Sequence, residues 1–322
     1  MANKADDNNL CPVERHLKRY WSAWLIFILG FALINLLVYY YSGELGNPEK
    51  AGAIGSFISG YIGTIIALGG VIMLIVTLQN QIQKDKDEGF ERRFFQLLDY
   101  HRQITSEIEL GDRAGTRVFV KLVDEFRVAL NCVDESCKKT QKQLTQLDRI
   151  NIAYLAFYYG TGENSTPTLR KYLECYDKEL IDYLIQWIED KTWKQRTNEI
   201  DKFGYTPLDG HQSRLGHYFR NLYQIVCYVD EHGNHERRLE FAGLLRGQLS
   251  NHEQALLCLN SISTLGKAWR TKGFIETYDM IKNIPPDFFS QSGIDVTTIY
   301  RNIDWEYKKH CSQDLEPNRD IR

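Results

Sequence analysis

The residue pair with the clearest chemical potential is Arg246 and His252, which have five residues between them. A guanidinium can stabilise the negative charge that develops on a phosphoryl group, and an imidazole can accept and return protons near neutral pH. This combination is suited to cleaving the phosphodiester backbone of RNA. Two helices would have to bring both side chains to one cleft, so the surrounding elements decide whether such chemistry is feasible.

The spacing of Arg246 and His252 resembles the R-x5-H catalytic motif of the HEPN ribonucleases. In this chain, Gly247 stands where that motif commonly has a polar residue. In addition, Ser250 and Glu253 form an S-x-x-E capping box, whose two side chains bond otherwise unpaired backbone donors at the start of a helix. His252 then lies in the first turn of that helix, where a solvent-facing role is expected. We favour this structural interpretation and keep the nuclease as an alternative.

Motifs of the common enzyme classes are missing from the sequence. It contains no G-x-x-x-x-G-K-[ST] phosphate loop, no H-E-x-x-H, no G-x-S-x-G and no paired C-x-x-C. His232 and His235 could supply two metal ligands together with Asp230 or Glu231, but a solvated turn between helices yields the same letters. We therefore expect no metal and no cofactor.

The cysteines and the net charge narrow the class of protein further. The seven cysteines are scattered, with Cys132 and Cys137 the closest pair, and their odd number favours reduced thiols. Cys227 and Cys258 lie among apolar helical residues, where a buried inert thiol is expected rather than a nucleophile. The net charge of −3 carries no signature of direct nucleic-acid binding.

Helical periodicity dominates the chain from residue 79 onward. One apolar series recurs every three or four residues and predicts a helix that Gly111 ends; it consists of Phe90, Phe94, Leu97, His101, Ile104 and Ile108. Further helices are predicted over 116–133, 138–159, 168–194, 213–230, 235–246, 251–263 and 272–282. Thr166 can cap the third of these, with Pro167 at its first position. Because no strand-like alternation is evident, the sequence predicts an all-α protein.

Residues 51–78 form an uncharged stretch that contains six glycines. A glycine inside a water-exposed helix costs about 1 kcal/mol relative to alanine, whereas in a bilayer the helix persists because nothing else can bond its backbone. At about 1.5 Å per residue, the stretch is longer than the roughly 30 Å hydrocarbon layer. Small residues recur every fourth position and predict a helix–helix contact face: Ala51, Gly55, Ser59, Gly63 and Ala67.

A second uncharged stretch covers residues 21–41 and has aromatic residues at both ends. Such aromatic belts favour the depth of the lipid headgroups. A signal peptide would have an apolar region of roughly 7 to 15 residues and a small-residue cleavage site, which this stretch lacks. The short link 42–50 contains turn-forming residues, so the two stretches should form a transmembrane hairpin. Asn35 could donate a hydrogen bond across it.

The basic residues predict how the hairpin is oriented. They flank the two stretches on the outer sides, whereas the link contains only Lys50, so both termini should be cytoplasmic. The predicted organisation is a tail (1–20), two transmembrane helices (21–41 and 51–78) joined by an extracytoplasmic link (42–50), a helical cytoplasmic domain (79–286) and a polar tail (287–322).

Three segments resemble the AbiC-like family of phage abortive infection proteins: FFQLLDYHRQI, HYFRNLYQIVCYVDEHG and LLRGQLSNHEQALLCLNSIS. The family pattern Y-F-R-x-L-Y corresponds to Tyr218, Phe219, Arg220, Leu222 and Tyr223. The pattern L-R-x-Q-L-S-x-x-E corresponds to Leu245, Arg246, Gln248, Leu249, Ser250 and Glu253. The resemblance extends over the two apolar stretches. The family often has an aromatic residue at the position of His252, which weakens the ribonuclease interpretation.

The resemblance implies a bacterial antiviral effector, located in the cell membrane, that arrests or kills the infected cell. The small-residue face favours association of hairpins as a homo-oligomer in the lipid bilayer. We expect this association to disturb the membrane. Two alternatives remain: the nuclease, and a noncatalytic sensor or scaffold that recruits another toxin. A regulatory partner from the defence system is a further hypothesis. For Arg220 and Arg246 we expect ion pairs, with Glu253 or another acid, rather than a bound phosphate.

Overall fold

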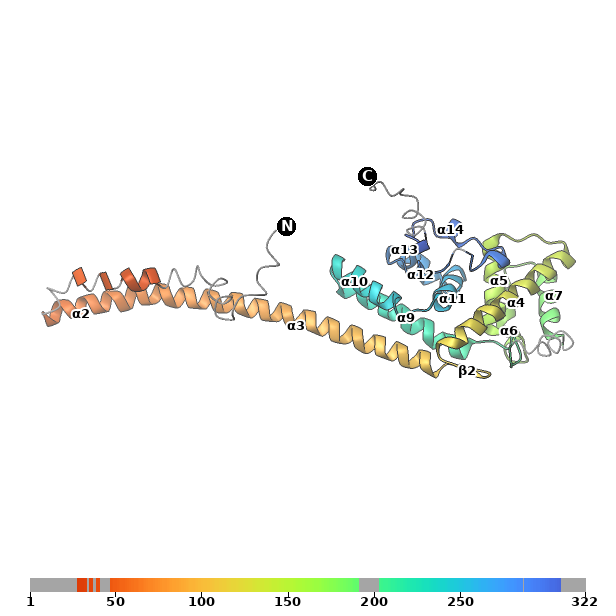
Figure 1. Cartoon of the computed structure of the whole chain (residues 1–322), viewed down its shortest axis with the longest axis horizontal. Helices are drawn as coiled ribbons and strands as arrows, with labels where there is room; N and C mark the ends of the chain where they lie inside the picture. The colour runs from red at the N-terminus through yellow and green to blue at the C-terminus, as the bar shows by residue number, and fades with distance from the viewer. Residues whose placement is uncertain are drawn as a thin grey trace, which may run out of the picture. The chain divides into compact units, whose positions relative to one another are not determined.

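The computed structural model of the protein describes residues 28–33, 35–36, 39–40, 47–190, 203–285 and 287–307 (Figure 1). The chain divides into two compact units, Met1–Asp85 and Lys86–Arg322.

The first unit contains α2 (Pro48–Phe57), the π-helix η2 (Ile58–Ile62) and the beginning of α3 (Gly63–Glu107). These elements follow one another as a single helical run that is long and apolar enough to cross a membrane, judged by length and composition. The other predicted span, 21–41, lies partly outside the described residues. Its described residues are helical and exposed, and Asn35 Nδ2 donates to the Phe31 carbonyl, four residues earlier, over 2.7 Å. The two-helix hairpin therefore stays a prediction.

The π-helix lies within the predicted small-residue face. Residues spaced four apart do not form a straight line along an α-helix, because one turn holds only 3.6 residues. The wider i→i+5 turn of η2 offsets this deviation, so residues on either side of η2 stay closer to one line. A Cβ atom built on Gly55 or on Gly63 would have no heavy atom within 4 Å, so no described residue of this chain covers the face at these two positions.

The second unit is helical, which confirms the predicted all-α class, with one small exception. After α3 its elements are β1 (Glu109–Leu110), β2 (Arg113–Ala114), α4 (Thr116–Thr140), α5 (Gln146–Tyr159), α6 (Thr166–Tyr172), α7 (Lys178–Glu189), α9 (Gln212–His232), α10 (His235–Arg246), α11 (Asn251–Ile262), α12 (Lys267–Thr271), α13 (Phe274–Thr277), the 3-10 helix η3 (Ser290–Ser292) and α14 (Val296–Ile299). The exception is an antiparallel pair of two-residue strands that turns at Gly111, whose φ is 58°. Thus Gly111 forms the turn, whereas α3 ends at Glu107.

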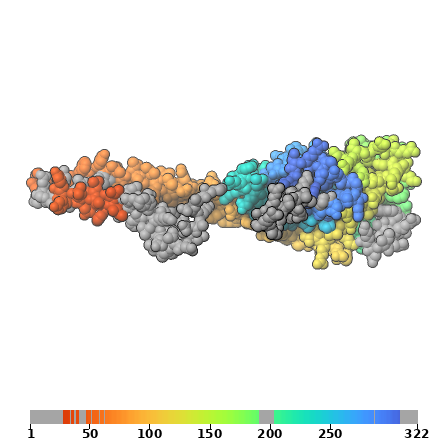
Figure 2. Space-filling view, turned by 45° about the horizontal axis from the view of Figure 1, so that its top comes forward, coloured from red at the N-terminus to blue at the C-terminus, as the bar shows by residue number. Residues whose placement is uncertain are grey.

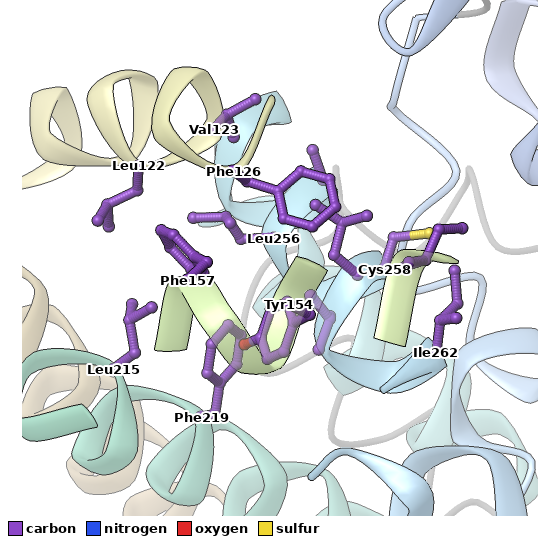
Figure 3. Close-up of a cluster of buried hydrophobic side chains, with 14 of the residues drawn as sticks. Leu122, Val123, Phe126, Tyr154, Phe157, Leu215, Phe219, Leu256, Cys258 and Ile262 are labelled. Atoms are coloured by element: carbon purple, nitrogen blue, oxygen red, sulfur yellow. The ribbon is translucent and has the colours of Figure 1, made fainter. Parts of the chain in front are cut away.

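Two central helices, α5 and α11, carry the core of this unit. Every residue from 150 to 157 and from 253 to 262 is buried, so neither helix has a polar face. The helices α4 and α9 cover them, and both bury only one apolar stripe. Figure 3 shows Phe126 of α4, Phe157 of α5 and Leu256 of α11 pointing into the same cluster. Burial of such side chains contributes roughly 1.5–3 kcal/mol each.

Several predicted helix boundaries are wrong. The gap predicted at 134–137 does not occur, because α4 continues to Thr140, where Gln141 adopts a left-handed φ of 54°. The predicted helix 168–194 is instead two helices, since Asp177 caps α7 by accepting a hydrogen bond from the Leu180 amide. The predicted helix 272–282 is interrupted at its start by Gly273, with φ 69°. In each case a local cap or a left-handed residue overrides a nearly continuous apolar pattern.

Residues 287–307 do not behave as the polar tail that the sequence predicts. Six of their side chains are buried in the core of the second unit: Phe289, Ile294, Val296, Tyr300, Ile303 and Trp305. In the space-filling view this blue segment packs within the globular unit (Figure 2). The apolar residues are separated by polar ones at irregular intervals, so they show no helical period, although each still removes apolar area from water. Residues 308–322 lie outside the described residues.

A buried carboxylate holds the segment 203–211 against the helices. Glu125 of α4 is fully buried, and it accepts hydrogen bonds from the Leu208 amide over 2.6 Å and from the Tyr205 hydroxyl. His211 Nε2 lies 2.9 Å from Glu125 Oε1 but is not aligned for a hydrogen bond. Because a buried polar group requires hydrogen-bond partners, Glu125 fixes the path of this segment.

The same segment approaches the end of α5 at glycine positions. Gly160 has a φ of 71°, and a Cβ atom built on it would lie 2.3 Å from the Asp209 carbonyl carbon. Gly210 is equally constrained, since its Cβ would lie 2.3 Å from the Tyr159 carbonyl oxygen. The hydrogen bond from the His211 amide to the Tyr158 carbonyl, 2.8 Å long, depends on this close approach.

We predict that Gly160→Ala lowers the free energy of unfolding by about 2 kcal/mol or more, because the added methyl group meets backbone and the φ value is unfavourable. Gly162→Ala is the matched control, since its Cβ would meet only the Ser165 hydroxyl, at 3.5 Å. Thermal denaturation of both variants measures the difference. Equal midpoints for the two variants would show that the segment 203–211 moves freely away from α5.

Candidate functional site

The candidate site is a polar junction where α3, α9 and the α10–α11 turn meet, buried at its centre and exposed at Arg102 and Gln248. We call it the α3 junction, and it consists of His101, Arg102, Tyr218, Asn221, Gln248, Ser250 and Glu253. Four of its members, Tyr218, Gln248, Ser250 and Glu253, belong to the two family patterns identified in the sequence. His101 and Arg102 come from α3, the helix that also carries the long apolar stretch.

Glu253 forms the centre of the α3 junction, and only 1% of its surface is exposed. The predicted capping box is confirmed, because Glu253 Oε2 accepts hydrogen bonds from the Ser250 amide (2.8 Å) and hydroxyl (2.7 Å) and the Ser250 side chain caps the Glu253 amide. The Tyr218 hydroxyl donates to Glu253 Oε1 over 3.0 Å. Burial raises the pKa of Glu253, whereas these hydrogen bonds lower it. Both carboxylate oxygens are thus satisfied without a cation.

His101 links α3 to α9 in the same region. Its Nδ1 lies 3.2 Å from the Asn221 Oδ1, which requires the proton on Nδ1, and its ring centre lies 4.8 Å from that of Tyr218. Burial lowers the pKa of His101 to about 4, although the hydrogen bond to Asn221 opposes this shift. The imidazole is therefore neutral at physiological pH. Its Nε2 has no partner among the described residues.

Arg102 completes the α3 junction at the protein surface. Its guanidinium donates twice to Gln248 Oε1, over 2.8 and 3.2 Å, and once to Asp99 Oδ1, over 3.1 Å. The exposed pair with Asp99 adds little stability, since surface ion pairs contribute about 0–1 kcal/mol. The bonds to Gln248 tie α3 to the turn before the capping box.

Arg246 does not form the ion pair with Glu253 that the sequence predicts. It is half-buried, and its Nη1 donates to the Tyr278 carbonyl over 3.0 Å. Burial lowers the pKa of Arg246, while the charges of Asp279 and Glu306 raise it. Arg246 thus holds the turn after α13 instead of a carboxylate of the α3 junction.

His252 contacts a different set of residues from Arg246. Its ring packs edge-on against Phe288, with 5.1 Å between centres. Burial and the nearby Arg127 lower the pKa of His252, and Asp124 raises it. Arg127 pairs with Asp124 over 2.7 Å and donates to the Phe288 carbonyl over 3.0 Å. The two residues of the R-x5-H motif therefore have separate partners, and the ribonuclease interpretation stays a prediction.

The remaining family-pattern residues lie along α9. Phe219 is buried in the core (Figure 3), and Tyr223 packs against Trp269, with 5.2 Å between ring centres. Arg220 is exposed, and across the described ranges no carboxylate lies within 4.0 Å of its guanidinium, so the expected ion pair does not form there. The predicted packing residues Gly55, Ser59, Gly63 and Ala67 lie in the first unit, and nothing tests their role.

The residues considered as metal ligands or nucleophiles lie elsewhere. His232 and His235 are exposed, and the ring of His232 stacks on Tyr228. No group of three side chains suited to hold a metal ion occurs in the part of the chain that the structure describes. Burial raises the pKa values of the Cys227 and Cys258 thiols, which makes both poor nucleophiles.

The chemistry of the α3 junction is that of a joint between helices. Its carboxylate is fully hydrogen-bonded, and the neutral imidazole packs between aromatic and amide side chains, away from water. Sequence analysis found the capping box because its spacing is local, but missed Asn221 and the role of Tyr218. The one feature that indicates a tertiary role for Asn221 and Tyr218 is their position on the buried face of α9.

Residues 210–289 match the family model described as putative phage abortive infection protein. This match covers α9 to α13, supports the resemblance to the AbiC-like family, and supports a role in phage defence. No curated protein matches the chain, and no solved structure does.

The pKa of His101 leads to a prediction about pH. The pKa of His101 is about 4 in the folded protein and about 6.5 in the unfolded chain. Below pH 6.5 the unfolded chain therefore takes up a proton that the folded protein does not, so the free energy of unfolding decreases as the pH falls from 6.5 towards 4. We expect the wild type to lose about 3 kcal/mol more than His101→Gln between these two pH values. Chemical denaturation at several pH values measures this, and parallel curves would contradict it.

Proposed function

We propose that this protein is a membrane-anchored effector of phage abortive infection. In this proposal its apolar helices lie in the bacterial cell membrane with both termini in the cytoplasm. The helical unit receives or transmits an infection signal, and the membrane helices of several copies associate, disturb the membrane and arrest growth. The match of residues 210–289 supports the defence role, and the apolar helix supports the membrane role.

The observation that carries the membrane role is the exposed apolar surface of α3. Ile72, Met73 and Leu74 are 55%, 62% and 68% exposed, and no residue of the most apolar window is buried. Apolar surface left in water costs roughly 25 cal/mol per Å², and a continuous patch of this kind marks a lipid or protein contact. A core helix of a soluble protein would bury this surface.

The polar groups of the apolar run also suit a bilayer. The Thr77 hydroxyl donates to the Met73 carbonyl over 2.8 Å, and the Thr64 hydroxyl donates to the Gly60 carbonyl. Both hydroxyls thus form hydrogen bonds within the same continuous helical run, as a hydrocarbon environment requires.

The helix α3 provides a physical connection for the proposed signal. It contains both the apolar run and the α3 junction residues His101 and Arg102. A turn or slide of α3 would have to break the His101–Asn221 and Arg102–Gln248 contacts. The α3 junction can therefore hold α3 in one state until the helical unit changes.

Association of copies would use the small-residue face of Gly55, Ser59, Gly63 and Ala67. Small residues allow two helix backbones to approach closely, and close packing is the main attraction between helices in lipid. No described residue covers Gly55 or Gly63. The competing use of this face is packing against the other predicted span of the same chain.

We predict that Gly63→Leu weakens both oligomerisation and growth arrest, because leucine separates the helices by a side chain. The protein should remain in the membrane. Gly69→Leu is the matched control, since Gly69 is equally uncovered but lies off the small-residue face. Cross-linking in membranes, growth after phage infection and membrane potential are measured together. Equal behaviour of the two variants, or full membrane potential until growth has stopped, would exclude the proposed mechanism.

We also predict that His252→Ala keeps growth arrest and leaves ribosomal and transfer RNA intact, as in the wild type. The reason is that His252 and Arg246 contact separate partners. Asn251→Ala, at the neighbouring exposed position, serves as the control. RNA integrity is measured after induction. RNA cleavage by the wild type that His252→Ala abolishes would favour the nuclease.

A further inference from the structure

A groove with a volume of about 460 Å³ lies away from the α3 junction, between the start of α5 and the elements α12, α13 and α14. Its size falls within the range of roughly 300–1,000 Å³ that is typical of small-molecule sites. It combines four apolar side chains, Leu147, Trp269, Ile275 and Ile299, with a few polar ones, and nothing in the proposed function uses it.

The groove contains one cation and one carboxylate that do not pair with each other. Arg270 is exposed, and no acidic side chain of the described ranges lies within 4.0 Å of its guanidinium. Glu276 is partly buried, and its Oε1 accepts one hydrogen bond from the backbone N–H of Asn302, over 3.3 Å. Its second oxygen accepts no hydrogen bond from the described residues. Each charge thus retains capacity for a ligand.

Tyr300 lines the groove together with the two charges. Tyr300 is buried, and its hydroxyl oxygen lies 2.6 Å from Ser261 Oγ. Burial raises the pKa of Tyr300, and Glu276 raises it further, whereas Arg270 lowers it. Arg270 and Glu276 both line the groove without forming an ion pair with each other, so their charged groups occupy separate positions in it. A ligand between them would meet opposite charges at two points.

The apolar walls determine what else a ligand must carry. Leu147 is 44% exposed, and Ile299 is partly buried beside it in the groove. These aliphatic side chains favour an apolar body over a second charge, because apolar area removed from water is stabilising. Gln146 and Thr298 add neutral hydrogen-bonding groups at the rim.

We propose that this groove binds a small zwitterion with an apolar body, the class to which free apolar α-amino acids belong. Arg270 binds the carboxylate, Glu276 binds the ammonium group, and Leu147 and Ile299 contact the apolar side chain. A guanidinium is suited to a carboxylate because it donates two parallel hydrogen bonds. The inference concerns binding only and does not depend on the proposed membrane activity.

The test uses the full-length protein in detergent and calorimetric titration with L-leucine and L-phenylalanine. Two capped probes separate the contributions of the charges: N-acetyl-L-leucine lacks the ammonium group, and L-leucinamide lacks the carboxylate. We expect each capped probe to bind about tenfold more weakly than leucine, or worse. No heat of binding for either amino acid at millimolar concentration, or equal affinity for capped and free leucine, overturns the proposal.

Two variants test which charged side chain binds which charged group of the ligand. Arg270→Gln should bind leucine and leucinamide equally, and Glu276→Gln should bind leucine and N-acetyl-leucine equally while keeping the acceptor for Asn302. Arg301→Gln, at an exposed arginine that does not line the groove, should bind like the wild type. Thermal midpoints confirm that all three variants fold. Wild-type selectivity in Arg270→Gln or Glu276→Gln, or binding of a mononucleotide in place of the amino acids, would contradict the assignment.

Discussion

The burial of the Glu253 carboxylate is the constraint on which the arrangement of the helical unit depends. A carboxylate removed from water must receive hydrogen bonds, and here they come from Ser250 at the start of α11 and from Tyr218 of α9. These donors fix how α9 lies against α11. With α9 in place, Asn221 meets His101 of α3. One buried acid thus connects a local helix cap to the helix that carries the apolar run.

The same principle operates a second time at Glu125. There the donors come from the backbone and side chains of the segment 203–211, and glycines at 160 and 210 allow the close approach that the segment needs. Among the described residues, no lysine or arginine forms an ion pair with either carboxylate, although His211 lies beside Glu125. The arginines of the family pattern, Arg220 and Arg246, lie outside both clusters.

This arrangement separates three tasks along the chain. The apolar run of α2, η2 and α3 provides surface suited to lipid, and the α3 junction restrains α3 by hydrogen bonds. The groove beside α12 contains a cation and a carboxylate that do not pair with each other. Because His101 and Arg102 belong to α3, the hydrogen bonds of the α3 junction involve the same helix that contains the apolar run.

The sequence alone determined the features whose causes are local. The uncharged run 51–78, the helix over 235–246 and the Ser250–Glu253 capping box all depend on residues within a few positions of one another. The tertiary structure decided which distant side chains meet: Tyr218 with Glu253, and His101 with Asn221. It also buried six apolar side chains within residues 287–307, which show no helical period. Periodicity records which face of a helix is apolar, but not which element covers it, since that choice depends on packing and hydrogen bonding across the whole unit.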